Sequence, residues 1–227
     1  MSLSDRTPPR DPGLRGLGTG GRHARGDEPA ASGAVLAGGL SRRMGRDKRR
    51  IEVEGVPLLR RAVDAARSVC REAVVVTAPG RPVPAELACG VPVVEDLRAD
   101  AGPLAGIEAA LATARHDLVL VLAGDHPDAS PTVLAALIRT LAATPSADAV
   151  ALGTPAGPQP LVAAYRREAL AVVSQLLDAG ERRPTCLPDH LTVLSLAEAD
   201  WRETDPQART AFDVDTPEDL VRWEATR

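Results

Sequence analysis

From residue 33 onward, short runs of aliphatic residues alternate with longer segments whose apolar residues recur at helical spacing. The run LVLVLA at 118–123 is apolar at every position, which is typical of a strand buried on both faces of a parallel sheet. Segment 57–69 repeats its apolar residues every three or four positions behind a proline, which predicts an amphipathic helix. This alternation predicts an α/β fold, a three-layer sandwich with a mainly parallel sheet.

The loops that follow the predicted strands are where a site is expected, because open parallel sheets bind ligands beyond the carboxyl ends of their strands.

Near the end of the sequence, the alternation of Phe212 and Val214 favours one further short strand. The other expected strands are 34–36, 73–77, 91–94, 118–123, 161–165 and 191–194, and the expected helices are 57–69, 103–114, 131–143, 167–178 and one after Pro217.

The first 30 residues differ in composition from the rest of the chain. They are rich in glycine, proline, arginine and aspartate and have almost no periodic apolar pattern, so we expect a disordered N-terminal extension over 1–30. Glycines at 16, 18 and 21 satisfy G-x-G-x-x-G, but that motif indicates a nucleotide only between a strand and a helix, and neither flanks it. One folded domain is expected over 31–227.

Charge and composition exclude several classes of protein. A net charge of −4 and an aromatic content of 2% argue against nucleic-acid binding, which needs a basic surface or a platform of aromatic rings. No apolar run reaches the length of a membrane span, and the first residues lack the apolar core of a signal peptide. Three widely spaced cysteines indicate a reducing compartment. We therefore expect a cytoplasmic protein without nucleic-acid or membrane partners.

The loop LAGGLSRRMGRDK (36–48) directly follows the first predicted strand and carries the strongest functional signal. Gly38 and Gly39 would let backbone N–H groups approach an anion without interference from a Cβ atom. Arg43 and Lys48 would add charge-assisted hydrogen bonds to phosphate. The loop lacks the Walker A pattern G-x-x-x-x-G-K-[ST]. It predicts a phosphate-binding loop, whereas the two arginines after Lys48 are read as solvated surface.

This loop resembles the signature L-A-G-G-x-S-x-R-M-G-x-D-K of the MobA-like nucleotidyltransferases. The resemblance implies a nucleotide-diphospho-sugar transferase (Rossmann-like) fold and an enzyme that uses Mg²⁺. It also implies the guanylyltransferase reaction of molybdenum cofactor synthesis, in which GMP passes from GTP to molybdopterin carrying molybdenum and pyrophosphate leaves. The resemblance continues, in order, through 56–63, 93–111, 122–131, 160–170, 176–183 and 211–220.

Asp125 stands at the tip of the 118–123 strand, where a carboxylate is well placed to hold Mg²⁺ through its oxygens. The alternative is an aspartate that caps the next helix, a role that Asp128 or Ser130 would fill better. The resemblance matches Asp125 to the family's magnesium-binding aspartate. His126 is interpreted as a loop residue, because Mg²⁺ prefers oxygen ligands and no second histidine is spaced for zinc.

Further site residues are implied by the resemblance. Asp96 matches the family position that contacts the guanosine of GTP, and Gly102 opens a turn that lines the same pocket. Arg182 and Arg183 match the family's G-E-R-R and are predicted to bind the acceptor phosphate. The predicted catalytic residues are Lys48, Arg43 and Asp125, and the predicted binding residues are Leu36, Ala37, Gly38, Gly39, Lys48, Thr77, Asp96, Gly102, Asp125, Arg182 and Arg183.

The segment AFDVDTPEDL (211–220) departs from the family, which carries asparagines where this chain has Asp213 and Asp215. We expect Asp215 to join Asp125 as a metal ligand. The two aspartates differ from the family mainly in what they imply for contacts with the acceptor substrate, not for contacts with the nucleotide. GTP and molybdopterin are the expected substrates, with other molybdenum-cofactor biosynthesis or acceptor enzymes as further partners. Three alternatives stay open: a cytidylyltransferase, a nucleotidyltransferase that acts on a sugar or polyol phosphate, and a non-catalytic nucleotide-binding regulator. A cytidylyltransferase would carry alanine in place of Gly38.

Overall fold

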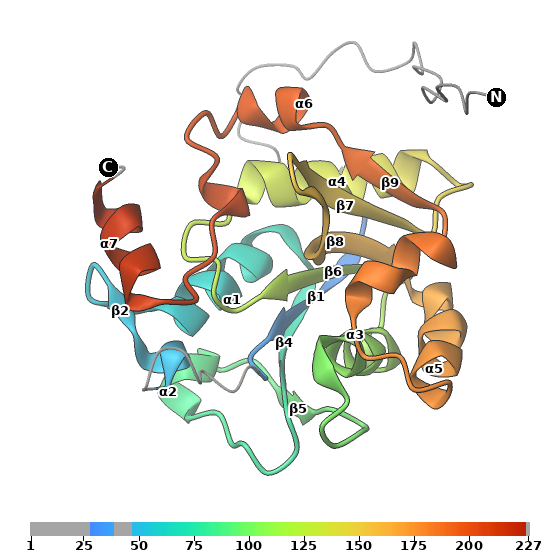
Figure 1. The fold of residues 1–227 in the computed structure, drawn as a ribbon, viewed down its shortest axis with the longest axis horizontal. Coiled ribbons are helices and arrows are strands. Elements are labelled where there is room, and N and C mark those ends of the chain that lie inside the picture. Colours follow the sequence, from blue (N-terminus) through green and yellow to red (C-terminus); the bar gives the residue numbers. More distant parts are fainter. Residues whose placement is uncertain (1–27, 39–46, 226–227) are drawn as a thin grey trace, which may run out of the picture.

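The computed structural model describes residues 28–38 and 47–225, which form a seven-stranded sheet between helices (Figure 1). The strand order is β5-β4-β1-β6-β8-β7-β9. The strands are β1 (Ala31–Leu36), β4 (Glu72–Thr77), β5 (Val93–Glu95), β6 (Leu118–Ala123), β7 (Ala149–Thr154), β8 (Gly157–Arg166) and β9 (Val193–Leu196).

Most neighbouring strands of this sheet are parallel. β1 pairs with both β4 and β6 in parallel, β4 pairs with β5 in parallel, and β7 pairs with β9 in parallel. The antiparallel pairs all involve β8, which lies between β6 and β7. The predicted α/β class with a mainly parallel sheet is therefore confirmed.

Helices cover both faces of the sheet, which gives three layers (Figure 1). Helices α1 (Leu58–Val69) and α4 (Pro131–Ala143) pack on one face, and α3 (Gly102–Thr113) and α5 (Leu170–Asp178) pack on the other. Smaller elements are a hairpin of β2 (Glu52–Val53) and β3 (Val56–Pro57), the helices α2 (Ala85–Ala88), α6 (Glu198–Arg202) and α7 (Pro217–Ala225), and the 3₁₀ turns η1 (Lys48–Arg50), η2 (Arg167–Ala169), η3 (Pro184–Asp189) and η4 (Arg209–Ala211).

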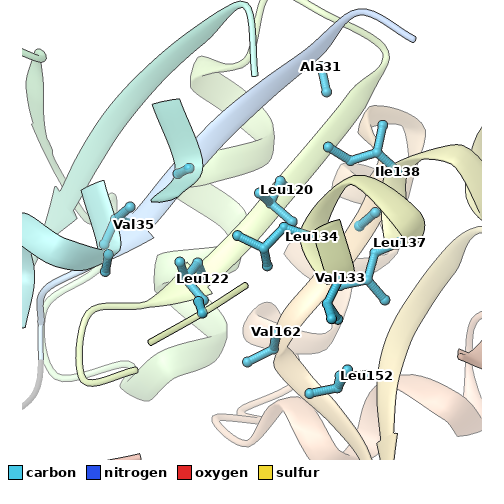
Figure 2. Close-up of a cluster of buried hydrophobic side chains, with 14 of the residues drawn as sticks. Ala31, Val35, Leu120, Leu122, Val133, Leu134, Leu137, Ile138, Leu152 and Val162 are labelled. Atoms are coloured by element: carbon cyan, nitrogen blue, oxygen red, sulfur yellow. The ribbon is translucent and has the colours of Figure 1, made fainter. Parts of the chain in front are cut away.

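The central strand β6 shows why its sequence is apolar throughout. Leu120 and Leu122 belong to the core beneath α4, and Figure 2 shows them beside Leu134 of that helix. Val119 and Val121 point the other way, into the core beneath α3. Side chains alternate along a strand, so a strand covered on both faces must be apolar at each position.

The C-terminal segment returns to the carboxyl ends of β1 and β6. Helix α7 packs beside the β2–β3 hairpin and the start of α1 (Figure 1), through a small core that contains Trp223 and Val214 together with Ile51, Val53 and Leu58. Trp223 is 2% exposed and Val214 is fully buried. This packing fixes the segment that carries Asp215.

The expected strand at 212–214 is wrong. The chain forms η4 and then runs irregularly to α7, and the N–H of Val214 donates to the carbonyl of Asp125 at 3.0 Å instead of to a strand. Val214 is buried in the small core, so its apolar character reflects packing and not a sheet position. The G-x-G-x-x-G motif and most of the expected 1–30 extension lie outside the described residues. None of the helices in the described part of the chain has the length and apolar character of a membrane span.

Candidate functional site

A cavity of about 560 Å³ opens at the carboxyl ends of β1, β4 and β6, the edge where the topology predicts a ligand. Its wall combines the segments that the sequence analysis placed after these strands. The described residues that line it are Leu36, Ala37, Gly38, Lys48, Arg49, Leu59, Val76, Ala78, Pro79, Arg81, Asp96, Ala99, Asp100, Ala101, Gly102, Pro103, Gly106, Ala123, Gly124, Asp125 and Leu161.

The residues that leave β1 are held tightly between the neighbouring strands. The N–H of Ala37 donates to the carbonyl of Val76 at 2.7 Å, and the N–H of Gly124 donates to the carbonyl of Leu36 at 3.0 Å. A Cβ atom on Gly124 would lie 3.1 Å from that same Leu36 oxygen, so this close approach of β1 and β6 requires glycine. It brings Asp125 close to the carboxyl end of β1.

Gly38 is different, because its own surroundings leave room for a larger residue. A Cβ atom there would lie 3.5 Å from the backbone nitrogen of Ala78, an ordinary van der Waals distance. The packing of the described residues therefore does not explain this glycine, whereas its place in the cavity wall does offer an explanation. Gly39 and Arg43, which the sequence analysis also assigned to this loop, lie outside the described residues.

Lys48 joins two aspartates that are distant in the sequence. Its Nζ donates to Oδ2 of Asp125 at 2.5 Å and to Oδ1 of Asp215 at 3.0 Å. Lys48 opens η1, a turn that is capped by the side chain of Asp47. Burial by itself would lower the pKa of Lys48, but the two carboxylates outweigh it and raise that pKa, so the ammonium stays charged. Here the structure brings together three of the predicted site residues.

Asp125 is ionised and has one oxygen to spare. Burial opposes its charge, but the positive fields of His126 and Lys48 outweigh burial and lower the pKa of Asp125. Its Oδ1 is buried and accepts no hydrogen bond from the described residues. Within those residues no three side chains of the ligating types converge as a complete metal site. Mg²⁺ in proteins commonly completes its coordination with waters and substrate phosphates.

Asp96 lies on the opposite wall of the cavity, directly after β5. Its N–H donates to the carbonyl of Thr77 at 2.8 Å, which fixes the loop to β4. Burial, with a smaller contribution from the charge of Glu108, raises the pKa of Asp96 to about 6. Thr77 itself is buried outside the cavity lining, and its hydroxyl donates to the carbonyl of Arg81 at 2.8 Å. Thr77 thus shapes the loop 78–81, and it is this loop that lines the cavity.

Gly102 connects the cavity wall to the loop that carries the two predicted acceptor-binding arginines. It has a φ of +70°, and a Cβ atom would come within 2.9 Å of the carbonyl oxygen of Arg182. The side chain of Arg182 donates to the carbonyls of Leu177 and Glu181, whereas the side chain of Arg183 is 82% exposed. Neither arginine lines the cavity, but both lie on the strand-end side where α3 begins.

The sequence analysis missed the loop 78–81 and the residue Leu161, which also line the cavity. The loop had a usable signal, since it follows a predicted strand as the other site loops do. Leu161 had none, because it lies in an apolar stretch of β8 that reads only as core. The interpretation of Arg49 as solvated surface is wrong: it lines the cavity, its side chain is 14% exposed, and its guanidinium donates to the carboxylate of Asp47.

Comparison with known proteins finds a matching family and similar proteins. The profile of the MobA-like NTP transferase domain matches residues 33–190. A probable molybdenum cofactor guanylyltransferase of Chloroflexus aggregans is 34% identical over 83% of this chain and 91% of its own length. The molybdenum cofactor guanylyltransferase of Pseudomonas putida strain GB-1 is 35% identical over 77% of this chain and 91% of its own length. The molybdopterin-guanine dinucleotide biosynthesis protein A of Archaeoglobus fulgidus superposes with a TM-score of 0.72 at 27% identity, over 84% of this chain and 95% of that one.

Proposed function

This chain belongs to the MobA-like NTP transferase family, and from that premise we propose that it is a molybdenum cofactor guanylyltransferase. It transfers GMP from GTP to the terminal phosphate of molybdenum-bearing molybdopterin and releases pyrophosphate. The observation that carries the proposal is the ammonium of Lys48 between Asp125 and Asp215, where Lys48 and Asp125 line the cavity together with Leu36–Gly38. That arrangement supplies both the cation and the carboxylates that a nucleotidyl transfer needs.

The chemistry is an in-line displacement at the α-phosphorus of GTP. An oxygen of the acceptor phosphate forms the new bond to phosphorus while the bond to the oxygen bridging to the β-phosphate breaks. The acceptor phosphate is already ionised near neutral pH, so no general base is needed, and catalysis consists of positioning and charge neutralisation. Lys48 donates to the phosphate oxygens, and the backbone of Leu36–Gly38 shapes the cavity wall beside them.

Asp125 and Asp215 are the residues that would hold Mg²⁺. The spare, buried Oδ1 of Asp125 and the carboxylate of Asp215 on the same ammonium provide the oxygen donors that this ion prefers. When bound, Mg²⁺ supplies neutralisation of negative charge on the α-phosphate and the leaving pyrophosphate. Asp213 is an exposed neighbour of this pair, and we give it no separate role.

Pyrophosphate release is the experiment that tests this function. Wild-type protein with Mg²⁺ should release pyrophosphate from GTP only when molybdenum-bearing molybdopterin is added. Release with CTP would favour the cytidylyl reaction, and release with a sugar or polyol phosphate as acceptor would favour that class of enzyme. Nucleotide binding without release under any condition would identify a regulator and contradict the proposal.

We expect Gly38→Ala to reduce the preference for GTP over CTP by about tenfold or more. The neighbouring backbone accommodates the added methyl group, so the change acts on the space left for the nucleotide base. The ratio of kcat/KM for GTP to that for CTP is the measurement, with the melting temperature as a check on folding. An unchanged ratio would contradict a role for Gly38 in selecting the base.

The affinity for GTP should depend on pH through Asp96. Its pKa of about 6 means that the carboxyl group is neutral below pH 6 and ionised above it. The ionised carboxylate accepts stronger, charge-assisted hydrogen bonds from the donors of guanosine than the neutral acid does, so kcat/KM for GTP should be about tenfold lower at pH 5 than at pH 8. Asp96→Asn should lower the plateau and remove this step from the profile. A step at the same pH in Asp96→Asn would assign it to another group.

We place this activity in the cytoplasm, with GTP and molybdopterin as small-molecule substrates. All three cysteines are free thiols, which supports a reducing compartment. The product is passed to another molybdenum-cofactor biosynthesis or acceptor enzyme.

A further inference from the structure

Asp128, three residues after Asp125, is the centre of a cluster that the proposed reaction does not use. Its Oδ1 accepts from Nη2 of Arg61 at 2.5 Å, and its Oδ2 accepts from Nη1 of Arg209 at 2.7 Å and from Nε1 of Trp223 at 3.0 Å. The expected alternative, a cap on α4, is not what this side chain does, since the N-cap position belongs to Ser130. We call Asp128, Arg61, Arg209 and Trp223 the Asp128 cluster.

The Asp128 cluster is compact and largely shielded from water. The side chains of Asp128, Arg61 and Arg209 are 16%, 20% and 17% exposed, and Trp223 is 2% exposed. Both guanidinium groups lie over the Trp223 ring, at 5.9 Å for Arg61 and 5.3 Å for Arg209. Charge-assisted hydrogen bonds and cation–π contacts in one place make a strong, directional anchor.

The cluster joins parts of the chain that are distant in sequence. Arg61 belongs to α1 and also donates from Nε to the carbonyl of Pro127, inside the loop that carries Asp125. Arg209 opens η4, and Trp223 belongs to α7. Asp215 lies between these last two elements. Asp128 therefore holds both ends of the segment 209–223 against the loop after β6.

Further contacts carry this anchoring to the reacting groups. Nδ1 of buried His126 donates to the carbonyl of Thr210 at 3.0 Å, and the N–H of Ser130 donates to the hydroxyl of Thr210 at 3.0 Å. The N–H of Val214 donates to the carbonyl of Asp125 at 3.0 Å. The loop 125–130 and the segment 209–215 thus form one unit, and its two carboxylates meet at Lys48.

We propose that Asp128 is a positioning residue that sets the distance between Asp125 and Asp215, and so prepares them to hold one metal ion together. This inference rests on the metal site and, for its catalytic readout, on the reaction that we propose above. Partners of metal-ligating carboxylates typically change metal affinity or activity by about 10- to 100-fold when they are removed. The Asp128 cluster acts in this way through the backbone that connects it to Asp125 and Asp215.

The test compares Asp128→Asn with Glu72→Gln in the full chain. Glu72 is a matched control, because its carboxylate also accepts a side-chain and a backbone hydrogen bond, from Ser32 and Arg115, but at the opposite end of the sheet. Asp128→Asn should lower kcat by about 10- to 100-fold, change KM for GTP by no more than about twofold, and raise the Mg²⁺ concentration for half-maximal rate. Glu72→Gln should leave all three unchanged.

A second measurement needs no turnover. The affinity of Mn²⁺ for the protein–GTP complex, followed by electron paramagnetic resonance, should fall by about tenfold or more in Asp128→Asn and not in Glu72→Gln. Trp223→Phe keeps an aromatic ring, although a smaller one than indole, and loses the hydrogen bond from Nε1 to Asp128, so it should show the same pattern with a loss below about tenfold. Arg209→Met combined with Asp128→Asn should cost no more than Asp128→Asn alone, because the residues act as one unit.

Equal Mn²⁺ affinity in Asp128→Asn and wild type would overturn the inference, as would a loss of kcat that Glu72→Gln reproduces. If Asp128→Asn fails to fold, Trp223→Phe decides on the same two readouts. Wild-type protein that binds Mn²⁺ with GTP but releases no pyrophosphate with molybdopterin would refute the proposed function. The effect of Asp128→Asn on Mn²⁺ affinity would in that case still support or refute the inference.

Discussion

Asp125→Asn should lower kcat for pyrophosphate release by about 10²- to 10³-fold while the protein stays folded. The substitution keeps the size of the side chain and removes the negative charge that faces Lys48 and the α-phosphate. The side chain is 15% exposed, so solvent does little to replace the lost charge. Initial rates at saturating GTP, Mg²⁺ and molybdopterin are the measurement.

Circular dichroism and the melting temperature show whether Asp125→Asn is folded. The loss should be in kcat far more than in KM for GTP, since we propose that the base binds where Asp96 and Gly102 line the cavity. Glu72→Gln serves again as the control for a lost carboxylate. Near-full activity of Asp125→Asn would refute the assignment of this residue and, with it, the metal site.

Lys48→Met should lower kcat/KM for GTP by about 10²- to 10³-fold and, at the same time, strengthen the binding of Mn²⁺ to the nucleotide-free protein. Methionine has nearly the same length as lysine but no charge. The triphosphate loses its cationic partner, which explains the lost activity. In wild-type protein the ammonium of Lys48 pairs with the carboxylates of Asp125 and Asp215. Without that ammonium, Mn²⁺ can bind the two carboxylates without a competing cation, so its affinity should rise.

These opposite signs separate Lys48 from a residue that only stabilises the fold. A partly unfolded variant would lose both turnover and Mn²⁺ binding. Arg50→Met changes the net charge equally from an exposed position in the same turn, and it should alter neither quantity. Weaker Mn²⁺ binding in Lys48→Met than in Arg50→Met would show that Lys48 does not compete with the metal.

Local patterns in the sequence predicted the bounds of individual helices and strands better than the contacts between segments that are distant in the sequence. The bounds of β6 and α4 are those expected, because a fully apolar run and a helical period are properties of the segments themselves. Strand β7 was not anticipated, although the segment 144–148, which contains Pro145, separates its run AVALGT from α4. The alternation of Phe212 and Val214 predicted a strand that does not form. Val214 is apolar because it packs against α1 and the β2–β3 hairpin.

The same division applies to the site. The loop after β1 and Asp125 could be found because each follows a predicted strand, and strand ends meet at one edge of a sheet. The contacts of Lys48 with Asp125 and Asp215 span 77 and 167 residues and depend on how the C-terminal segment returns. The role of Asp128 could not be predicted for the same reason: nothing in its neighbourhood in the sequence indicates that Arg209 and Trp223 lie beside it.

Because the C-terminal segment packs back beside the carboxyl ends of β1 and β6, the residues of the site are translated in a fixed order on the ribosome. Every described residue of the cavity wall has been translated once Leu161 is added, whereas Asp215 comes 54 residues later, by subtraction of the two positions. At roughly 5–20 residues per second, that interval is about 3–11 seconds. The described residues that line the cavity are therefore made first. Asp215 joins Asp125 at Lys48 only after the segment 209–223 has left the ribosome and packed against the loop after β6.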